Sequence, residues 1–555
     1  MARTRNRLPH KTEMSGKIKY IILLGILFVA ACMRLIKLGV IPEGVTNDEA
    51  GAIFNAYSIA KTGQSLDGRQ YPLSFTLDSS SSPVFIYLAA PFTAIFGPSG
   101  FSLRLPFALI SVATIGLLYF LTKQLFDNTA IALFSSFVLA VSPWHIHMNR
   151  GAYDGPITFF FLATLIVLAY GFSARKGNIL YSLPLLAISF YSYHATKIFW
   201  IVFIPFLFLM QRRKLLQNSR QSILFIIGFA AIVCSFWFVL VRQGVTRQQV
   251  IAFPDLPKLT RQVNWERSVN NAPQILRVLY SNKATIYIKG IIGKYLEAFS
   301  PQFLFVSGEG GIYGTWNHGV LYLLDLPLLI FGFVYLFRTK KILARNLIIG
   351  SVLIVPLCSS ITVDVSWSLR GIFLLPLFAI VIGCGAYQFI KWTKHLKPIV
   401  ARLTVILLIL LYVWSIGGYI YLYFFRYSIY GAEYWFASSK DISIVIGSIR
   451  QQYQRVWVAG AEDMYIFQYG LYNHSSLQQV QKAWNGRWPK QIDNVFFLEQ
   501  CIKTGNKPFN PVRDLPQNTL YVTRESCHPE AIPDITIRDR GEPLRILWKV
   551  YKHID

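Results

Sequence analysis

Near its start the chain carries the apolar run YIILLGILFVAACMRLIKLGV, residues 20–40, followed directly by IPEGVTNDEAGAIF, residues 41–54. A run of about 20 mostly apolar residues can cross a bilayer as an α-helix. It contains Arg34 and Lys37, and no small-residue cleavage site follows it, so we predict a retained helix rather than a signal peptide. The 19 residues before the run, which are rich in Arg and Lys, are then expected to stay in the cytoplasm.

The overall composition also indicates a polytopic membrane protein. Of the 555 residues 54% are hydrophobic and only 15% are charged, which is unusual for a soluble chain of this length. The formal net charge is +27, but the basic residues gather in short segments between apolar runs. Cytoplasmic loops of membrane proteins have this pattern, so the charge predicts orientation and does not indicate nucleic-acid binding.

Further apolar runs predict about eleven membrane-spanning helices. Alternation from a cytoplasmic N-terminus places the short basic loops inside and the loops 41–101 and 242–319 outside. Within the first outer loop, SSPVFIYLAAPFTAIFG, residues 81–97, is too short for a span and is read as an interfacial or re-entrant helix. The predicted spans are residues 20–40, 102–122, 129–144, 156–172, 178–193, 198–210, 222–241, 320–337, 345–362, 371–391 and 402–425.

The last 130 residues, 426–555, differ in character from the rest of the chain. The stretches VWVAGAEDMYIFQYG, NVFFLEQC, NTLYVTRESC and PLRILWKVYK are strand-like runs separated by turn residues and charges, and they predict a small soluble α/β domain on the outer face. Cys501 and Cys527 both fall in this region, so either a disulfide in an oxidising compartment or two unpaired thiols is expected.

The acids of TNDE, residues 46–49, have two compatible interpretations. Thr46 and Glu49 fit the S/T-x-x-E capping box at the start of a helix. Asp48 next to a membrane wall can act as a general base towards a hydroxyl group held within hydrogen-bond reach. Neighbours on a helix point about 100° apart, so Glu49 can cap the helix while Asp48 faces a cavity.

Several cations lie at or near the outer ends of the predicted spans, where an unpaired charge is costly. Any one of them can be explained as a side chain that reaches to the interface. As a set they predict binding of an anionic headgroup, because Arg and Lys are the side chains that recognise phosphate. The set consists of Arg69, Arg104, Arg150, Lys197 and Arg370.

The outer turns also hold histidines and acids, which are candidates for contacts with substrate or for a lid. Asp154 fits either a helix cap or a partner for Arg150. Glu309 and His318 flank a glycine-rich turn typical of a mobile or tight loop. His145 and His147 have metal-like spacing only on an extended segment, so no metal site is assigned. His194 and Asp364 complete this set, and the aromatic candidates for sugar stacking or an interfacial belt are Trp144, Tyr153, Tyr193, Trp316 and Trp367.

Taken in chain order, these sequence features resemble the GT-C class of membrane glycosyltransferases, in particular the branch of protein O-mannosyltransferases and lipid A aminoarabinose transferases. The resemblance covers residues 20–425, which are expected to form the catalytic transmembrane domain. It is carried by the acidic pair Asp48 and Glu49, SLRLP (102–106), SPWHIHMNR (142–150), LYLLDLPLLIFG (321–332) and LRGIFLLPLFAI (369–380).

The resemblance implies that Asp48 is the catalytic base and that Arg104 binds the donor phosphate, with Lys197, Arg370 and Arg150 as further candidates. The donor would be a sugar on a polyprenyl phosphate in the outer leaflet, transferred with inversion to a protein, glycolipid or glycan hydroxyl. No cofactor is expected, although a divalent metal stays open. The expected location is a prokaryotic plasma membrane, with the active site and the C-terminal domain outside the cytoplasm.

Two alternatives stay open at this point. A flippase or transporter for a polyprenyl-linked saccharide would also have many spans and outward cations, but it more often has ionisable groups at mid-membrane and inverted repeats. An oligosaccharyltransferase or a ligase would use a diphosphate carrier, and a requirement for a divalent metal would favour the oligosaccharyltransferase.

Overall fold

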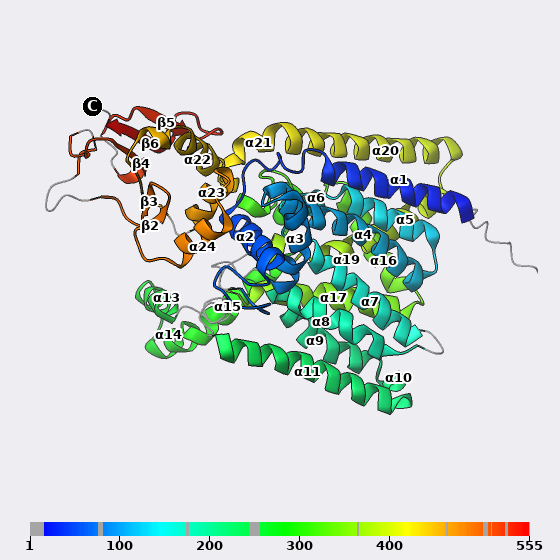
Figure 1. Ribbon diagram of the computed structural model, residues 1–555. Coiled ribbons are helices and arrows are strands. Elements are labelled where there is room, and N and C mark those ends of the chain that lie inside the picture. The colour runs from blue at the N-terminus through cyan, green and yellow to red at the C-terminus, as the bar shows by residue number, and fades with distance from the viewer. Residues whose placement is uncertain are drawn as a thin grey trace, which may run out of the picture.

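A computed structural model describes residues 16–75, 82–173, 177–243, 256–362, 366–461, 464–502, 509–511, 513–527 and 531–553. Long helices run side by side, a six-stranded sheet lies at one end of this bundle, and α10 lies at the opposite end (Figure 1). The predicted fold class, a mainly helical membrane protein with a small C-terminal α/β domain, is confirmed.

The first half of the described chain is helical apart from its loops. Its helices often begin at a polar cap, as at Ser99, Asn128 and Ser142, whose side chains accept backbone N–H groups. The elements are α1 (Gly16–Leu35), α2 (Asn47–Thr62), α3 (Pro83–Phe96), α4 (Gly100–Phe126), α5 (Thr129–Val141), α6 (Pro143–Arg150), α7 (Pro156–Ser173), η1 (Ile179–Ser182), α8 (Leu183–Ser192), α9 (His194–Met210), α10 (Arg212–Gln217) and α11 (Ser219–Gln243).

The second half returns to the bundle and leaves it again near Tyr421. Its elements are α13 (Leu256–Ser268), α14 (Gln274–Tyr280), α15 (Lys283–Glu297), η2 (Gln302–Val306), η3 (Gly311–Tyr313), α16 (Asp325–Arg338), α17 (Ile342–Ser360), α18 (Trp367–Arg370), α19 (Leu374–Thr393), α20 (Pro398–Tyr421), η4 (Leu422–Arg426), α21 (Tyr427–Tyr430), η5 (Ala432–Trp435), α22 (Ala437–Ile449) and η6 (Arg450–Gln452).

Among the described residues, seven helices are long and apolar enough to cross a membrane, and α5 and α6, which meet at 52°, form an eighth if the bent pair is one span. The other three predicted spans fall on helices of 17 residues or fewer, which are η1–α8, α9 and α16. The predicted count of eleven is therefore not confirmed. The seven are Lys17–Leu35, Gly100–Phe126, Pro156–Ser173, Ser219–Val239, Ile342–Ser360, Leu374–Thr393 and Pro398–Tyr430.

The middle of the bundle depends on small residues. α19 packs against both α16 and α5. A Cβ atom at Gly385 on α19 would lie 1.8 Å from the carbonyl oxygen of Leu328 on α16, so the backbones of α19 and α16 are in close contact. Close contact of this kind is a common way to hold membrane helices together, because lipid supplies little hydrophobic driving force between them.

The C-terminal region forms one mixed sheet with the strand order β2-β3-β1-β4-β6-β5. β3, β1 and β4 are parallel, while β2, β6 and β5 pair antiparallel with their neighbours. Two helices, α23 (Tyr465–Tyr472) and α24 (Leu477–Asn485), belong to the same region. The strands are β1 (Arg455–Ala459), β2 (Lys490–Ile492), β3 (Val495–Leu498), β4 (Thr519–Arg524), β5 (Ile535–Arg538) and β6 (Ile546–His553), and η7 (Glu525–Cys527) follows β4.

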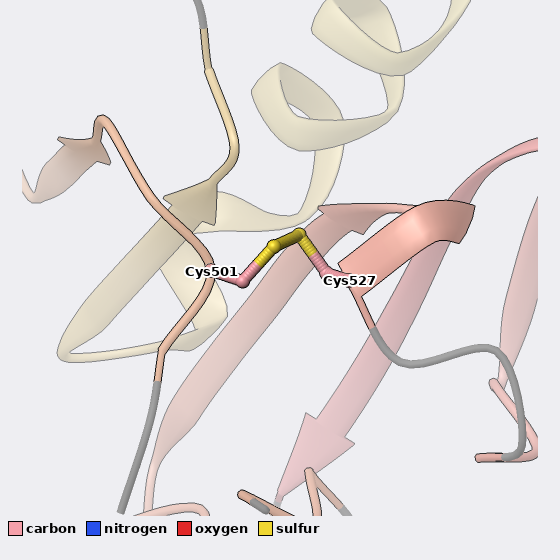
Figure 2. The surroundings of a disulfide bond; sticks show 2 residues. All are labelled: Cys501 and Cys527. Carbon is pink, nitrogen blue, oxygen red and sulfur yellow. A yellow bond between two sulfur atoms is a disulfide. The ribbon is translucent and has the colours of Figure 1, made fainter.

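All four strand-like runs predicted in this region contain a strand. The first run was read too broadly, because its second half forms α23 rather than continuing β1. β2 and β5 were not predicted, and both are short strands of three and four residues. The Cys501–Cys527 disulfide is confirmed, and it joins the segment after β3 to the segment after β4 (Figure 2).

The sheet region and the first outer loop share a hydrophobic core. Phe54 on α2 lies 6.0 Å from Phe467 on α23, measured between ring centroids, and Ile53 is buried in the same cluster. α3, the helix predicted within this loop, has 14 residues and packs against α2 and α4. The C-terminal region therefore packs directly against α2, the helix that begins at the acidic pair.

Candidate functional site

The two acids at the start of α2 have different environments. Glu49 forms the predicted capping box, because its backbone N–H donates to Thr46 Oγ1 and its side chain accepts from the Thr46 N–H, both at 3.1 Å. Glu49 is buried at 4% exposure, whereas Asp48 is partly exposed. The structure thus separates a buried capping acid from a partly exposed acid, as the helical spacing predicts.

Arg104, predicted to bind a donor phosphate, is instead held by protein groups. Its Nε and one terminal nitrogen donate to the two carboxylate oxygens of Glu49, each at 2.8 Å. Further donors reach the carbonyls of Pro42 at 3.0 Å and Gly44 at 2.9 Å. Arg104 is fully buried, and these contacts fix the loop before α2, while its binding of a donor phosphate stays a prediction.

Gly44 makes this arrangement possible. Its φ of +91° lies in the region that favours glycine, and a Cβ atom there would lie 2.2 Å from the carbonyl oxygen of Trp435. The Trp435 ring in turn lies 5.2 Å from the guanidinium carbon of Arg104. Residues from the segment after α20 therefore complete the surroundings of an ion pair formed by the first outer loop.

Asp48 interacts electrostatically with three tyrosines from separate parts of the chain, and these residues are called the group around Asp48. Its charge acts on Tyr153, in the turn after α6, on Tyr193, before α9, and on Tyr313, at the end of η3. Burial and the charges of Glu49 and Asp48 raise the pKa of Tyr153, and burial is also the main cause that raises the pKa of Tyr313. These two hydroxyls therefore stay protonated at neutral pH and can donate hydrogen bonds beside the carboxylate.

Glu309 and Arg370 are counted in the same group because their charges act on Tyr193 and Tyr313. The Ser368 backbone N–H, in α18, donates to Glu309 Oε2 at 2.7 Å, which ties the glycine-rich loop to that helix. Arg370, the last residue of α18, donates to the Thr362 hydroxyl, and it also interacts with Tyr193 and with Glu309. Burial raises the pKa of Glu309, while the Ser368 contact and the charge of Arg370 oppose that rise.

Arg150, another predicted phosphate-binding residue, caps the C-terminal end of α1. Its two terminal nitrogens donate to the carbonyls of Met33, Arg34, Lys37 and Ile41 at 2.8–3.3 Å. A cation in this position satisfies carbonyls that the helix leaves without partners. The side chain is fully buried and its Nε has no hydrogen-bond partner, and its binding of phosphate stays a prediction.

Asp154 does not pair with Arg150 but ends a buried polar chain. It accepts from the Asn149 side chain at 3.0 Å, and from the Thr158 hydroxyl at 2.9 Å and backbone N–H at 3.1 Å. His145 lies 3.6 Å away and contacts Arg34 on its other side. Burial raises the pKa of Asp154 to about 6.

The remaining predicted residues lie at other places. Lys197 donates to the Tyr193 carbonyl at 3.1 Å and lies 4.7 Å from the Phe236 ring, so it borders the group around Asp48. His194 is the neighbouring residue at the start of α9. Arg69 pairs with Asp67 at 2.8 Å within the turn that follows α2.

His147 and His318 contact backbone carbonyl groups of the outer loops. His147 contacts the Ile312 carbonyl at 2.9 Å, and the His318 ring contacts the Gly319 carbonyl at 2.6 Å. Burial lowers the pKa of His318. No group of three or more His, Cys, Asp or Glu residues among the described ranges is arranged to hold a metal ion. Asp364 lies outside the described residues.

Two important contributors were not predicted from the sequence. Tyr313 lies in the glycine-rich loop, in which the sequence pointed only to Glu309 and His318. Gln468 on α23 donates to the Val45 carbonyl at 2.5 Å and to Asn47 at 3.4 Å, so the C-terminal region holds the start of α2. No local pattern marks Gln468, because its partners lie more than 420 residues earlier in the chain.

Comparison with known proteins gives one family match. Residues 80–238 match the family model described as dolichyl-phosphate-mannose-protein mannosyltransferase. The match confirms the resemblance drawn from the sequence and supports a membrane glycosyltransferase. No curated protein matches.

Three solved structures have a similar course of the chain. An oligosaccharyltransferase of Archaeoglobus fulgidus, tethered to an acceptor peptide, is 13% identical over 83% of this chain and 63% of its own, with a TM-score of 0.48. This chain thus spans less than two thirds of that enzyme. ArnT of Cupriavidus metallidurans, bound to undecaprenyl phosphate, is 12% identical over 96% and 97%, with a TM-score of 0.46. The S. cerevisiae protein O-mannosyltransferase Pmt1–Pmt2 complex, bound to its sugar donor, is 15% identical over 41% and 34%, with a TM-score of 0.31.

Proposed function

We propose that this chain, which carries a mannosyltransferase family match over residues 80–238, is an inverting glycosyltransferase that takes a sugar from a polyprenyl-phosphate carrier and joins it to an acceptor hydroxyl. The family match supports the reaction class. The observation that carries the proposal is that Tyr153, whose hydroxyl lies 3.5 Å from Thr46 Oγ1 at the start of α2, contacts Tyr313 at 5.6 Å between ring centroids, and that the charges of Asp48, Glu309 and Arg370 all act on Tyr313.

Asp48 has the properties that a general base needs. It is partly exposed, and Glu49, not Asp48, neutralises Arg104, so the Asp48 carboxylate is not committed to that ion pair. In the proposed step the acceptor oxygen attacks the anomeric carbon and its proton passes to Asp48, while the bond between that carbon and the phosphate oxygen breaks. A single displacement of this kind inverts the anomeric centre.

Arg370 is the cation best placed to stabilise the departing phosphate. Its charge acts on Tyr193 and Tyr313, as the charge of Asp48 does, whereas Arg104 and Arg150 are fully buried and contact the loop before α2 and the end of α1. A preformed cation at the point where negative charge develops lowers the barrier of the step. Lys197 borders the same group and would add a second positive charge. Polyprenyl phosphate leaves as a stable anion, so no strong acid is required.

Glu309 and the tyrosines are assigned supporting roles. Glu309 holds α18 through the Ser368 N–H and so orients Arg370. The protonated hydroxyls of Tyr153 and Tyr313 are suited to donate hydrogen bonds to a sugar or to the acceptor. Arg104 and Glu49 together fix the loop that leads into α2, and we assign them to positioning Asp48.

The orientation follows from the distribution of basic residues. With the N-terminus in the cytoplasm, the positive-inside rule places α10 inside and the group around Asp48 outside, together with the region from residue 426 onward. The donor would then enter from the outer leaflet, and a protein, glycolipid or glycan acceptor would approach from the watery side. A prokaryotic plasma membrane has this arrangement.

The experiment uses purified full-length protein in lipid with a panel of polyprenyl-phosphate sugars. We expect one donor to be consumed, by transfer or slow hydrolysis, and consumption to fall at least about a hundredfold in Asp48→Asn. Asp127→Asn is the matched control, because Asp127 lies at the far end of α4 and pairs with Lys123. Consumption of diphosphate carriers alone, or equal consumption by Asp48→Asn, would overturn the proposal.

A further inference from the structure

Helices α13, α14 and α15 expose an unusual number of apolar side chains for a region outside the spanning helices. Eleven large apolar residues between 256 and 297 are exposed, against three among the described residues of 432–553. Ile275 is 81% exposed, Tyr280 70% and Trp265 65%. On α15 the exposed apolar positions Ile288, Ile292 and Leu296 recur every four residues, which places them on one face of the helix. Apolar surface of this extent marks an interaction site.

The same segment is strongly basic. Residues 256–297 contain seven Lys and Arg residues but only two acids, Glu266 and Glu297, which gives a net charge of +5. A segment that combines exposed apolar side chains with an excess of positive charge is typical of helices that lie in the plane of an anionic membrane surface. The basic residues are Lys258, Arg261, Arg267, Arg277, Lys283, Lys289 and Lys294.

The segment is fixed near a membrane boundary at its C-terminal end. Its N-terminal end follows α11, which includes the span Ser219–Val239. At its C-terminal end Lys294 donates to the Thr362 carbonyl at 2.7 Å, two residues beyond the span Ile342–Ser360. Tyr295 donates to the Leu353 carbonyl within that span at 2.9 Å. Figure 1 shows α13, α14 and α15 at the end of the bundle that also carries the sheet.

The three helices also form one unit. Arg267 on α13 donates to the Ser281 carbonyl, between α14 and α15, at 2.7 Å, and α13 packs on α15. A unit held against α17 through α15 cannot move far from the bilayer surface. Its exposed apolar side chains therefore have the lipid surface as their nearest partner.

We propose that α13–α15 is a membrane-docking platform that lies on the bilayer surface, on the same side of the membrane as the group around Asp48. Its apolar side chains lie among the headgroups and upper acyl chains, and its Lys and Arg residues contact anionic phospholipids. The proposal does not depend on the transferase reaction. It assigns to this loop a contact with the bulk lipid surface rather than with the sugar donor.

The test measures water access at one position on the platform and at a matched control. A nitroxide label is placed at Ile275→Cys or, in a second protein, at Ile532→Cys in the sheet region, since these two isoleucines are 81% and 85% exposed. Cys32, Cys234, Cys358 and Cys384 are replaced by Ala, and the Cys501–Cys527 disulfide is kept. The full chain is placed in nanodiscs with one molecule each, of phosphatidylcholine with or without phosphatidylglycerol.

We expect the label at residue 275 to collide with a water-soluble nickel reagent at least threefold less often than the label at residue 532, and with oxygen more often. Phosphatidylglycerol should strengthen the protection of residue 275 alone, and Arg277→Gln with Lys283→Gln and Lys289→Gln should remove that increase. Equal nickel collision at both positions in both lipids would overturn the proposal. Protection that is absent in these discs but present in discs with two molecules would also overturn it, because a second copy would then be the partner. Gel filtration confirms that each labelled protein is folded.

Discussion

The ion pair between Glu49 and Arg104 provides a sharp test of how the two adjacent acids divide their roles. Glu49→Gln keeps the size of the side chain and its ability to complete the capping box, since Gln also serves at that position. It removes only the negative charge that faces Arg104. Arg104 is 0% exposed and would then be buried with two carbonyls but no anion. Leaving a buried charge without its partner costs about 3–5 kcal/mol.

Thermal unfolding of the purified protein in detergent measures this cost. We expect Glu49→Gln to lower Tm by roughly 5 °C or more, and Asp48→Asn to lower it less, because Asp48 is partly exposed and Glu49 holds Arg104. The double variant Glu49→Gln with Arg104→Met should recover part of the loss, since it removes the stranded charge. A Tm of Glu49→Gln within about one degree of wild type, or a larger loss in Asp48→Asn, would refute the assignment.

Three further predictions concern the surroundings of the site. The pKa of Asp154 is raised from 3.8 to about 6 in the folded protein, so its contribution to stability is full below pH 3.8 and is lost as pH rises through 6; Tm measured from pH 4 to 7 should therefore fall less in Asp154→Asn than in wild type. Gln468→Ala should reduce turnover about tenfold or more because it loosens the start of α2, and Gln468→Glu should not restore turnover. Gln481→Ala should have a much smaller effect, because Gln481 contacts the Leu66 carbonyl, which lies beyond the other end of α2. Replacing both Cys501 and Cys527 by Ser should destabilise the C-terminal region by about 3 kcal/mol, seen as faster proteolysis after β3 while the spans stay protected.

The general architecture could be predicted from the sequence because membrane spans and caps are local features. Each of the eleven apolar runs falls on helix, and the capping box at Thr46 follows from four consecutive residues. The number of spans could not be fixed in the same way. Hydropathy alone does not distinguish a span from a short helix such as α16, which is 14 residues long and packs between others.

The arrangement of the candidate site residues could be predicted only in part, because a charged residue at the end of a span does not reveal which residue it will contact. The charges of Asp48, Glu309 and Arg370 act on the same tyrosines, whereas Arg104 and Arg150, predicted from the same pattern, contact protein groups 55 to 117 residues away. The difference lies in which carbonyls and carboxylates the fold brings to each guanidinium. Gln468 has no sequence signal at all, since its effect depends on how the C-terminal region docks on α2.

In the proposed mechanism Asp48 takes the proton of the acceptor and does not bind the donor. Donor affinity and single-turnover rate, measured side by side for wild type and Asp48→Asn with the donor identified in the panel, separate these two roles. We expect Asp48→Asn to have a donor dissociation constant within about twofold of wild type and a single-turnover rate lower by a factor of about 10² to 10⁴. An unchanged rate, or a loss of donor binding large enough to explain the whole fall in turnover, would contradict it.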